Sequence, residues 1–188
     1  MQNDENLIVA TANGDESAFE ELVEKYKLIV FNIIYQYLCN NSETEDVAQE
    51  VFIKVWKHAG TFNPKYKFST WIYRITVNTC LNYKKSNKTL TKHYSLDDIE
   101  ESGNTDTPEK LSNDTPETKE RNEIISEALL TLPSNQKMAL ILSQFERRSY
   151  KEIAEIMEIS VSAVESLIFR AKSNMKKQLL PLKVKNQL

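Results

Sequence analysis

Glycine and proline are scarce in this sequence, with three glycines and five prolines among 188 residues. Sheet-rich folds need more of these turn-forming residues, so the scarcity favours helices. The sequence also lacks any apolar run close to twenty residues, and its first residues, MQNDENLIVA, lack the basic and apolar segments of a secretory signal. We therefore expect an all-α, soluble, cytoplasmic protein with no direct insertion into a membrane.

Cysteine and histidine are equally sparse, with two of each. The two cysteines, Cys39 and Cys80, lie far apart, and together with His58 and His93 they match no zinc-binding spacing. Reduced thiols in the protein core are the expected state. The sequence contains no glycine-rich phosphate loop and no nucleophile elbow. We therefore expect no metal, no cofactor, no catalytic residue and no enzymatic activity.

Acidic residues are absent from two long stretches, although the net charge is −3. Residues 51–96 and 166–188 contain lysines and arginines but no aspartate or glutamate. Between these stretches, acidic residues are concentrated in Asp97–Glu120. Two basic zones separated by an acidic one predict two surfaces that bind a polyanion. The alternative, that the lysines only keep ordinary helices soluble, does not explain the complete absence of acids.

Apolar residues at helical spacing predict a first domain over residues 1–85. A short helix is expected near Glu5–Ala12 and a long one over 15–39. Ser42 and Glu45 fit a capping box for a third helix, which ends near Gly60. After a loop at Asn63–Pro64, Ser69 is a candidate N-cap for a helix over Thr70–Lys85.

Residues 86–121 have a different composition, rich in Ser, Asn, Thr, Asp and Glu and poor in apolar residues. Such a segment buries too little surface to offset the entropy lost on ordering, so we expect a flexible acidic linker. A second small helical domain is then predicted over residues 122–188.

The second domain contains the most diagnostic local pattern, SYKEIAEIMEISVSAVESLIFRAKSNMKKQL, which begins at Ser149. Ser149 and Glu152 form a capping box for a short helix that contains the small Ala154. A turn at Glu158–Ser160 leads into a longer helix. A short helix, a tight turn and a second helix predict a helix-turn-helix, and the basic run that follows favours DNA as its ligand.

Two longer segments resemble one family. DVAQEVFIKVWKHAGTFNPKYKFSTWIYRITVNTCLNYKK (Asp46–Lys85) resembles the second domain of extracytoplasmic-function (ECF) sigma factors, which are group 4 of the sigma-70 family. LPSNQKMALILSQFERRSYKEIAEIMEISVSAVESLIFRAKSNMKKQL resembles their fourth domain. The resemblance implies a subunit that binds bacterial core RNA polymerase and directs it to promoter DNA. It also implies an anti-sigma factor as partner, and we expect a monomer when the protein is free.

The resemblance assigns roles to particular residues of the first domain. The helix that carries Asp46, Gln49, Glu50 and Phe52 is expected to dock on core polymerase, although Phe52 is as compatible with the core. The next helix and the loop before it are expected to read the opened minus-ten element. The residues implied there are Tyr66, Lys67, Phe68, Arg74, Asn78, Asn82 and Lys85, with Tyr66 or Phe68 stacking on a flipped base.

In the second domain the resemblance implies contacts with the minus-thirty-five duplex. The residues concerned are Ser162, Glu165, Ser166, Phe169, Arg170 and Lys172. The sequence departs from the family at Glu158, where glycine is common. If this position needs a positive φ, glutamate there costs about 1 kcal/mol of strain.

Besides an enzyme, two other functions are weighed against this one. A helix-turn-helix regulator that acts without docking on polymerase needs a receiver or ligand domain, and the helical N-terminal half offers none. A helical scaffold, such as an anti-sigma or adaptor protein, does not need two acid-free basic runs.

For the sigma factor, we expect poor DNA binding by the free chain, because the linker holds its two DNA-reading surfaces apart. The linker's path, through a polymerase channel or as a plain tether, stays open.

Overall fold

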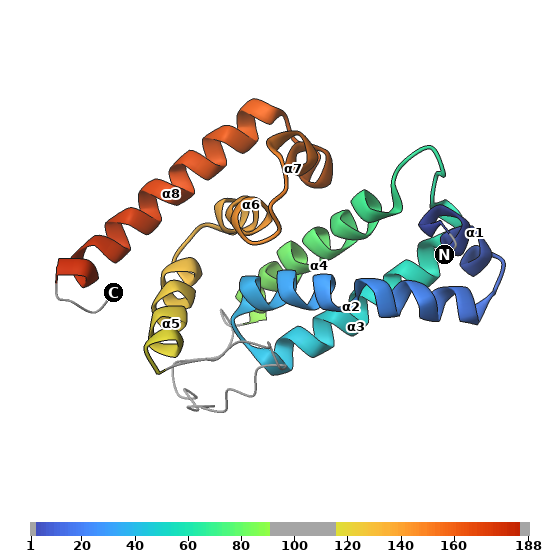
Figure 1. The fold of residues 1–188 in the computed structure, drawn as a ribbon, viewed down its shortest axis with the longest axis horizontal. Helices are drawn as coiled ribbons and strands as arrows, with labels where there is room; N and C mark the ends of the chain where they lie inside the picture. Colours follow the sequence, from blue (N-terminus) through green and yellow to red (C-terminus); the bar gives the residue numbers. More distant parts are fainter. Residues whose placement is uncertain (1–2, 91–115, 185–188) are drawn as a thin grey trace.

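The N-terminal half forms four helices, whose buried residues follow the spacing seen in the sequence. The computed structural model describes residues 3–90 and 116–184. The helices are α1 (Asp4–Ala12), α2 (Glu16–Leu38), α3 (Asn41–His58) and α4 (Phe68–Leu90), with a short 3-10 turn, η1 (Ala59–Thr61), after α3. Helices α2, α3 and α4 pack on one another (Figure 1), and they bury residues such as Leu22, Val51 and Ile72 between them.

The C-terminal half forms the helix-turn-helix and two supporting helices. These are α5 (Pro116–Leu130), α6 (Ser134–Gln144), α7 (Tyr150–Met157) and α8 (Val161–Val184). Helices α5 and α6 both contact α8, and Leu129, Leu140 and Ala171 form a small core where they meet. The expected all-α fold is confirmed, since all the elements of residues 3–90 and 116–184 are helical.

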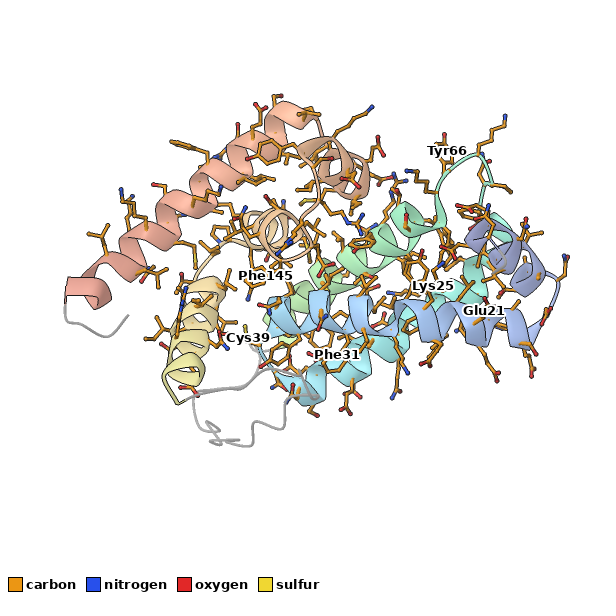
Figure 2. The ribbon with its side chains drawn as sticks, viewed as in Figure 1. Glu21, Lys25, Phe31, Cys39, Tyr66 and Phe145 are labelled. Atoms are coloured by element: carbon orange, nitrogen blue, oxygen red, sulfur yellow. The ribbon has the colours of Figure 1, made fainter. Side chains whose placement is uncertain are left out.

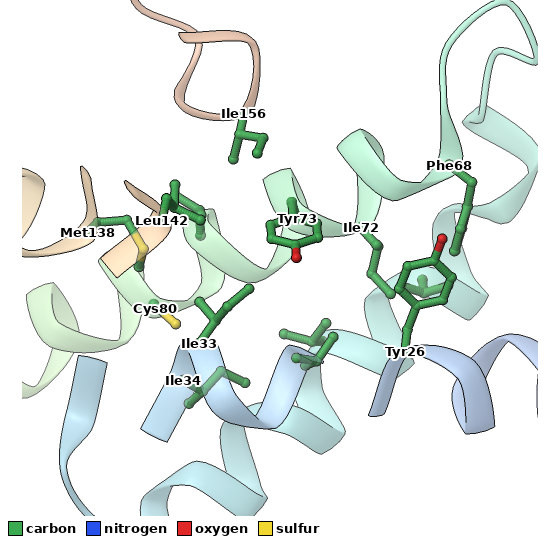
Figure 3. Packing of buried hydrophobic residues seen from close by; sticks show 14 of the residues in the cluster. Tyr26, Ile33, Ile34, Phe68, Ile72, Tyr73, Cys80, Met138, Leu142 and Ile156 are labelled. Atoms are coloured by element: carbon green, nitrogen blue, oxygen red, sulfur yellow. The ribbon is translucent and has the colours of Figure 1, made fainter. Parts of the chain in front are cut away.

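The two halves are packed against each other rather than held apart. One apolar cluster includes Ile33 of α2, Cys80 of α4, Met138 and Leu142 of α6, and Ile156 of α7 (Figure 3). Each of these side chains is buried. The separation of the two surfaces that we expected from the linker is therefore not the arrangement of this structure, in which the N-terminal and C-terminal halves share a core.

Helix boundaries differ from the expected ones at the starts of α3 and α4. The side chain of Asn40, not Ser42, caps α3 by accepting a hydrogen bond from the backbone N–H of Glu43 at 3.1 Å, so the Ser42–Glu45 capping box is wrong. Asparagine is an equally good cap and lies earlier in the chain. Helix α4 begins at Phe68, so Ser69 lies inside it.

The segment predicted as a linker, 86–121, is helical at both of its ends. Helix α4 continues through Leu90, and α5 starts at Pro116, so both ends of the predicted linker are helical. The rest of the predicted linker, residues 91–115, lies outside the described residues. Within the described ranges, no helix is both long enough and apolar enough to cross a bilayer.

Candidate nucleic-acid interface

The helix-turn-helix is built by α7, α8 and the turn between them. The capping box at the start of α7 is confirmed: the Ser149 hydroxyl accepts from the Glu152 backbone, and the Glu152 carboxylate accepts from the Ser149 backbone. The Ser149 hydroxyl also donates to the Glu152 carboxylate at 2.7 Å. This hydrogen bond first, and then the one from the Ser149 backbone N–H, lower the pKa of the Glu152 carboxyl. Ala154 is buried where α7 crosses its neighbours, as its small size predicts.

The turn contains a left-handed residue. Glu158 follows the last residue of α7 with a φ of 56°, and its backbone N–H donates to the carbonyl of Ala154. This is the conformation in which helices commonly end, usually at glycine. The positive φ considered for this position is therefore present, with glutamate bearing it.

One face of α8 presents a row of polar side chains to solvent. Ser162, Glu165, Ser166, Arg170 and Lys172 are all exposed. Phe169, on the same face, is 76% exposed, so its ring does not pack on the preceding helix. The N-terminal end of α8 is fixed by Ser160, whose hydroxyl accepts from the backbone N–H of Ala163 at 3.2 Å. An exposed helix face of short polar groups with an arginine suits the base edges of a major groove.

Helix α4 carries a second set of polar residues. Asn78 and Asn82 are exposed one helical turn apart. Arg74, one turn earlier, is half-buried and ion-paired with Glu158 across the two halves of the molecule. Lys85 lies within α4, but its side chain is outside the described residues. The asparagines are thus available to a ligand, whereas Arg74 already has a partner.

The two aromatic candidates for base stacking have different environments: Tyr66 lies in the loop before α4, and Phe68 is the first residue of α4. Tyr66 is 68% exposed and projects from the loop next to the exposed Lys67 (Figure 2). Phe68 is 0% exposed, and its ring packs edge-on against Tyr26 at 5.2 Å between centroids. The assignment of Phe68 as a stacking residue is therefore wrong, because its ring is part of the core. Trp71 packs against Phe62 and Phe68.

Helix α3 exposes the residues expected to dock on polymerase, with one exception. Asp46, Gln49 and Glu50 are exposed, and Glu50 forms an ion pair with Lys54 at 2.6 Å. Phe52 is half-buried and packs against the core. Of the two roles considered for Phe52, the structure favours the core.

Comparison with known families identifies the chain. The sigma-70 region 2 model matches residues 22–89, and the sigma-70 region 4 model matches residues 122–175. The chain belongs to the sigma-70 family. The ECF RNA polymerase sigma-E factor of Haemophilus influenzae is 35% identical to this sigma factor, over 95% of this chain and 96% of its own length. The RNA polymerase sigma-H factor of Pseudomonas aeruginosa is 33% identical, over 97% of this chain and 96% of its own. The sigma factor is therefore of the ECF type, as its sequence motifs indicated.

Solved structures have the same fold. CnrH, solved in complex with the cytosolic domain of CnrY, aligns with a TM-score of 0.66 at 20% identity, over 94% of this chain and 96% of CnrH. The sigma factor RpoE of Bartonella quintana, solved in complex with the anti-sigma factor NepR, aligns with a TM-score of 0.63 at 16% identity, over 86% of this chain and 96% of RpoE.

The structure of this sigma factor adds residues that the sequence did not single out. Ile53 and Trp56 of α3 are 51% and 38% exposed. Trp56 packs edge-on against Phe19 of α2, with 5.0 Å between ring centroids. The two rings line a shallow hollow rimmed by the α2 glutamates Glu16, Glu20, Glu21 and Glu24. The sequence alone does not reveal this exposed ring pair, because the helical spacing of Trp56 also fits a core residue.

Proposed function

We propose that this sigma factor docks on bacterial core RNA polymerase through α3, and reads promoter DNA with α4 and α8. The observation that carries the proposal is the order of the two matched regions on one chain, each with an exposed polar face where its ligand would lie. We assign the polymerase-binding and minus-ten functions to residues 1–85 and the minus-thirty-five function to residues 122–188, joined by the segment between them.

Core docking would use the exposed rim of α3. Asp46, Gln49 and Glu50 offer acceptors and negative charge, which suit a basic partner helix. Ile53 supplies an exposed apolar contact on the same helix, and exposed apolar groups surrounded by polar ones are typical anchors of interfaces. Ile53, rather than the half-buried Phe52, is therefore the apolar anchor that we propose for α3.

Minus-ten recognition would use the exposed groups of α4 and its preceding loop. Asn78 and Asn82 each offer a donor and an acceptor to a base. Tyr66 offers an exposed ring on which a flipped base can stack, and stacking tolerates any base because every base has a π-face. Lys67, Arg74 and Lys85 would hold phosphates of the opened strand.

Minus-thirty-five recognition would use the exposed face of α8. Ser162, Glu165, Ser166 and Arg170 are proposed to meet base edges in the major groove, and Lys172 the phosphate backbone. Phe169 would contact apolar parts of the DNA, because 76% of it is free of protein contacts.

The partners we propose follow from the same family. An ECF sigma factor acts through core polymerase on promoter DNA in the cytoplasm, has no catalytic activity of its own and needs no cofactor. CnrH was solved with the cytosolic domain of CnrY bound, and the Bartonella RpoE with the anti-sigma factor NepR. We propose that an anti-sigma factor likewise binds this chain, which is a monomer when free.

In vitro transcription tests the proposal. Purified bacterial core polymerase is incubated with promoter fragments from the source genome, with and without the protein. Defined transcripts that require the protein, from starts that share two upstream motifs, are expected. If the protein neither forms a stable complex with core enzyme nor stimulates transcription, the regulator that acts without polymerase replaces this proposal.

A substitution in α4 separates recognition from docking. Asn78→Ala is expected to leave core binding unchanged and to reduce initiation about tenfold, since one bidentate base contact contributes about 1–3 kcal/mol of discrimination. Asn32→Ala removes an exposed asparagine from α2 and serves as the matched control. An equal loss of core binding by Asn78→Ala would argue against the recognition role of Asn78.

A further inference from the structure

Helix α4 begins without a capping residue of its own. Its first hydrogen bond runs from the backbone N–H of Trp71 to the carbonyl of Lys67, so Lys67 is the residue that precedes the helix. A lysine side chain has no acceptor atom, and it cannot satisfy the free N–H groups of a first helical turn. The N-cap expected from the sequence, Ser69, lies inside the helix. A side-chain cap for α4 therefore has to come from another part of the chain.

Glu5 of α1 supplies this cap. Its half-buried carboxylate accepts a hydrogen bond from the backbone N–H of Phe68, the first residue of α4, at 3.2 Å. The two residues lie 63 positions apart in sequence. A negative charge at the N-terminal end of a helix is also favoured by the aligned peptide dipoles. Glu5 thus replaces the local cap that Lys67 cannot provide.

Helix α1 is fixed to the rest of the first domain on both sides of Glu5. Before it, the Asp4 carboxylate accepts from the Tyr26 hydroxyl of α2 at 2.7 Å. After it, Leu7 and Ile8 are buried in the core. Helix α1 also contacts η1 and α4 (Figure 1). The carboxylate that caps α4 therefore belongs to a helix whose own position is set by its neighbours.

The loop between η1 and α4 is held at both ends. At its start, the Asn63 side chain accepts from the backbone N–H of Lys65 at 3.1 Å, and the Asn63 carbonyl accepts from that of Tyr66 at 3.0 Å. At its end, Phe68 is held by its buried ring and by Glu5. Between these two anchors, the Tyr66 side chain is 68% exposed. The position of its ring thus depends on the Asn63 turn and on the Glu5 contact.

Helix α1 carries none of the residues assigned above to docking or to DNA. The sigma-70 region 2 match begins at residue 22, beyond the end of α1 at Ala12. Its contacts nevertheless reach the start of α4, next to the loop that carries Tyr66. We propose that Glu5 is a positioning residue for promoter opening, which fixes the start of α4 and so presents Tyr66 to a flipped base. The inference rests on the proposed function for the role of Tyr66.

Two substitutions of Glu5 separate the hydrogen bond from the charge. Glu5→Ala removes both. Glu5→Gln removes only the charge, because its amide oxygen can still accept from the Phe68 N–H. Glu123→Ala, which removes an exposed carboxylate from α5, is the matched control.

Hydrogen exchange of the free chain, followed by NMR, tests the contact itself. In Glu5→Ala the amide of Phe68 is expected to exchange about fivefold faster, which is the usual effect of losing a helix cap. Glu5→Gln and Glu123→Ala should stay within about twofold of the unmodified chain. Unchanged exchange in Glu5→Ala would overturn the inference and leave the sigma factor assignment intact.

Promoter opening with core polymerase tests the positioning role. Fluorescence of 2-aminopurine in the minus-ten element follows opening, and anisotropy of labelled protein follows the affinity for core enzyme. Glu5→Ala is expected to open the promoter about fivefold more slowly with an unchanged affinity for core. Glu5→Gln should open it at nearly the rate of the unmodified chain. Normal opening by Glu5→Ala, or an equal loss in Glu5→Gln, would overturn the proposal.

A double-mutant cycle with Tyr66 distinguishes positioning from a general weakening of the domain. In the Tyr66→Ala background, Glu5→Ala should slow opening by less than about twofold, because the ring that Glu5 positions is already gone. Losses that multiply would overturn the positioning role and leave the stacking role of Tyr66 standing. Normal opening by Tyr66→Ala alone would remove the stacking role in the proposed function, and this inference with it.

Discussion

Arg74 of α4 and Glu158 of the helix-turn-helix form an ion pair of 3.0 Å, although they lie 84 positions apart in sequence (158 − 74). Glu158 occupies a left-handed position, φ 56°, that helices usually fill with glycine. The same residue thus carries backbone strain within its own turn and an attraction to the other half of the molecule. At Glu158 the backbone strain destabilises the turn, whereas the ion pair with Arg74 stabilises the contact between the halves.

Replacing Glu158 with glycine should separate the two effects. Glu158→Gly relieves strain of about 1 kcal/mol and loses an exposed ion pair that contributes less than that, so we expect unfolding to require a few tenths of a kcal/mol more. Glu158→Gln keeps the strained backbone and should be no more stable than the unmodified chain. Urea denaturation of the three proteins checks the order. A glycine variant less stable than the glutamine variant would contradict it.

The two aromatic residues around the loop before α4 should respond in opposite ways. Phe68→Ala empties a core site and is expected to lower the free energy of unfolding by about 3–5 kcal/mol. Tyr66→Ala changes an exposed side chain and should alter stability by less than about 0.5 kcal/mol. With core polymerase, however, Tyr66→Ala should slow promoter opening, followed by 2-aminopurine fluorescence in the minus-ten element. Normal opening by Tyr66→Ala would remove the stacking role.

The sequence predicted most features that depend on neighbouring residues, although the Ser42–Glu45 capping box is wrong. The helical spacing of residues such as Leu22 and Ile72 and the Ser149–Glu152 capping box are local properties, and the structure confirms them. The sequence left open whether Glu158 needs a positive φ, and the structure has it there. Hydrophobic periodicity and capping act within one or two turns of helix, so they can be recognised without knowledge of the fold.

Features that depend on distant residues were missed or misassigned. Phe68 and Tyr66 differ by two positions and have similar chemistry, and only the packing of Tyr26 and Phe62 around Phe68 shows that it is core. The contact of Tyr73 with Glu146 and Arg148 leaves no trace in sequence spacing, because it joins separate helices.

The polar residues of α8 fitted a DNA-reading face from the sequence alone, and the structure leaves them exposed.

Substitutions of Ile53 and Phe52 in α3 should have different effects, because Ile53 is the proposed interface anchor and Phe52 packs against the core. Ile53→Ala should weaken binding to core polymerase about tenfold without changing stability, because half of Ile53 is exposed. Phe52→Ala should lower the free energy of unfolding by about 2 kcal/mol. Leu28→Ala removes an exposed apolar side chain from α2 and should do neither. Affinity is measured by fluorescence anisotropy of labelled protein with core enzyme. Full affinity in Ile53→Ala would exclude it as the anchor.

The capping box of α7 should make stability depend on pH in the acid range. Hydrogen bonds to Ser149 lower the pKa of the Glu152 carboxyl below its usual 4.5. The ionised carboxylate therefore stabilises the fold above about pH 4.5, and this contribution is lost as the pH falls through the lowered pKa. Ser149→Ala should cost about 1 kcal/mol at pH 7, and less at pH 3. Guanidinium denaturation at both values measures the difference. A cost that does not shrink in acid would mean that Glu152 takes no part.

Cys80 provides a chemical probe of the interface between the halves. Burial raises the pKa of its thiol to about 12, and the side chain shares a core with Met138 and Leu142 of the other half. The reactive form of a thiol is the thiolate, so Cys80 should be alkylated very slowly at pH 8. Half-buried Cys39 should react first, and mass spectrometry of peptides distinguishes the two.

In the Tyr73→Phe/Glu158→Gln protein, the halves separate more often and water reaches Cys80, so its alkylation should be several times faster, with Cys39 little changed. Equal rates at Cys80 in the variant and the unmodified chain would mean that the apolar interface stays closed without the polar contacts of Arg74 and Tyr73.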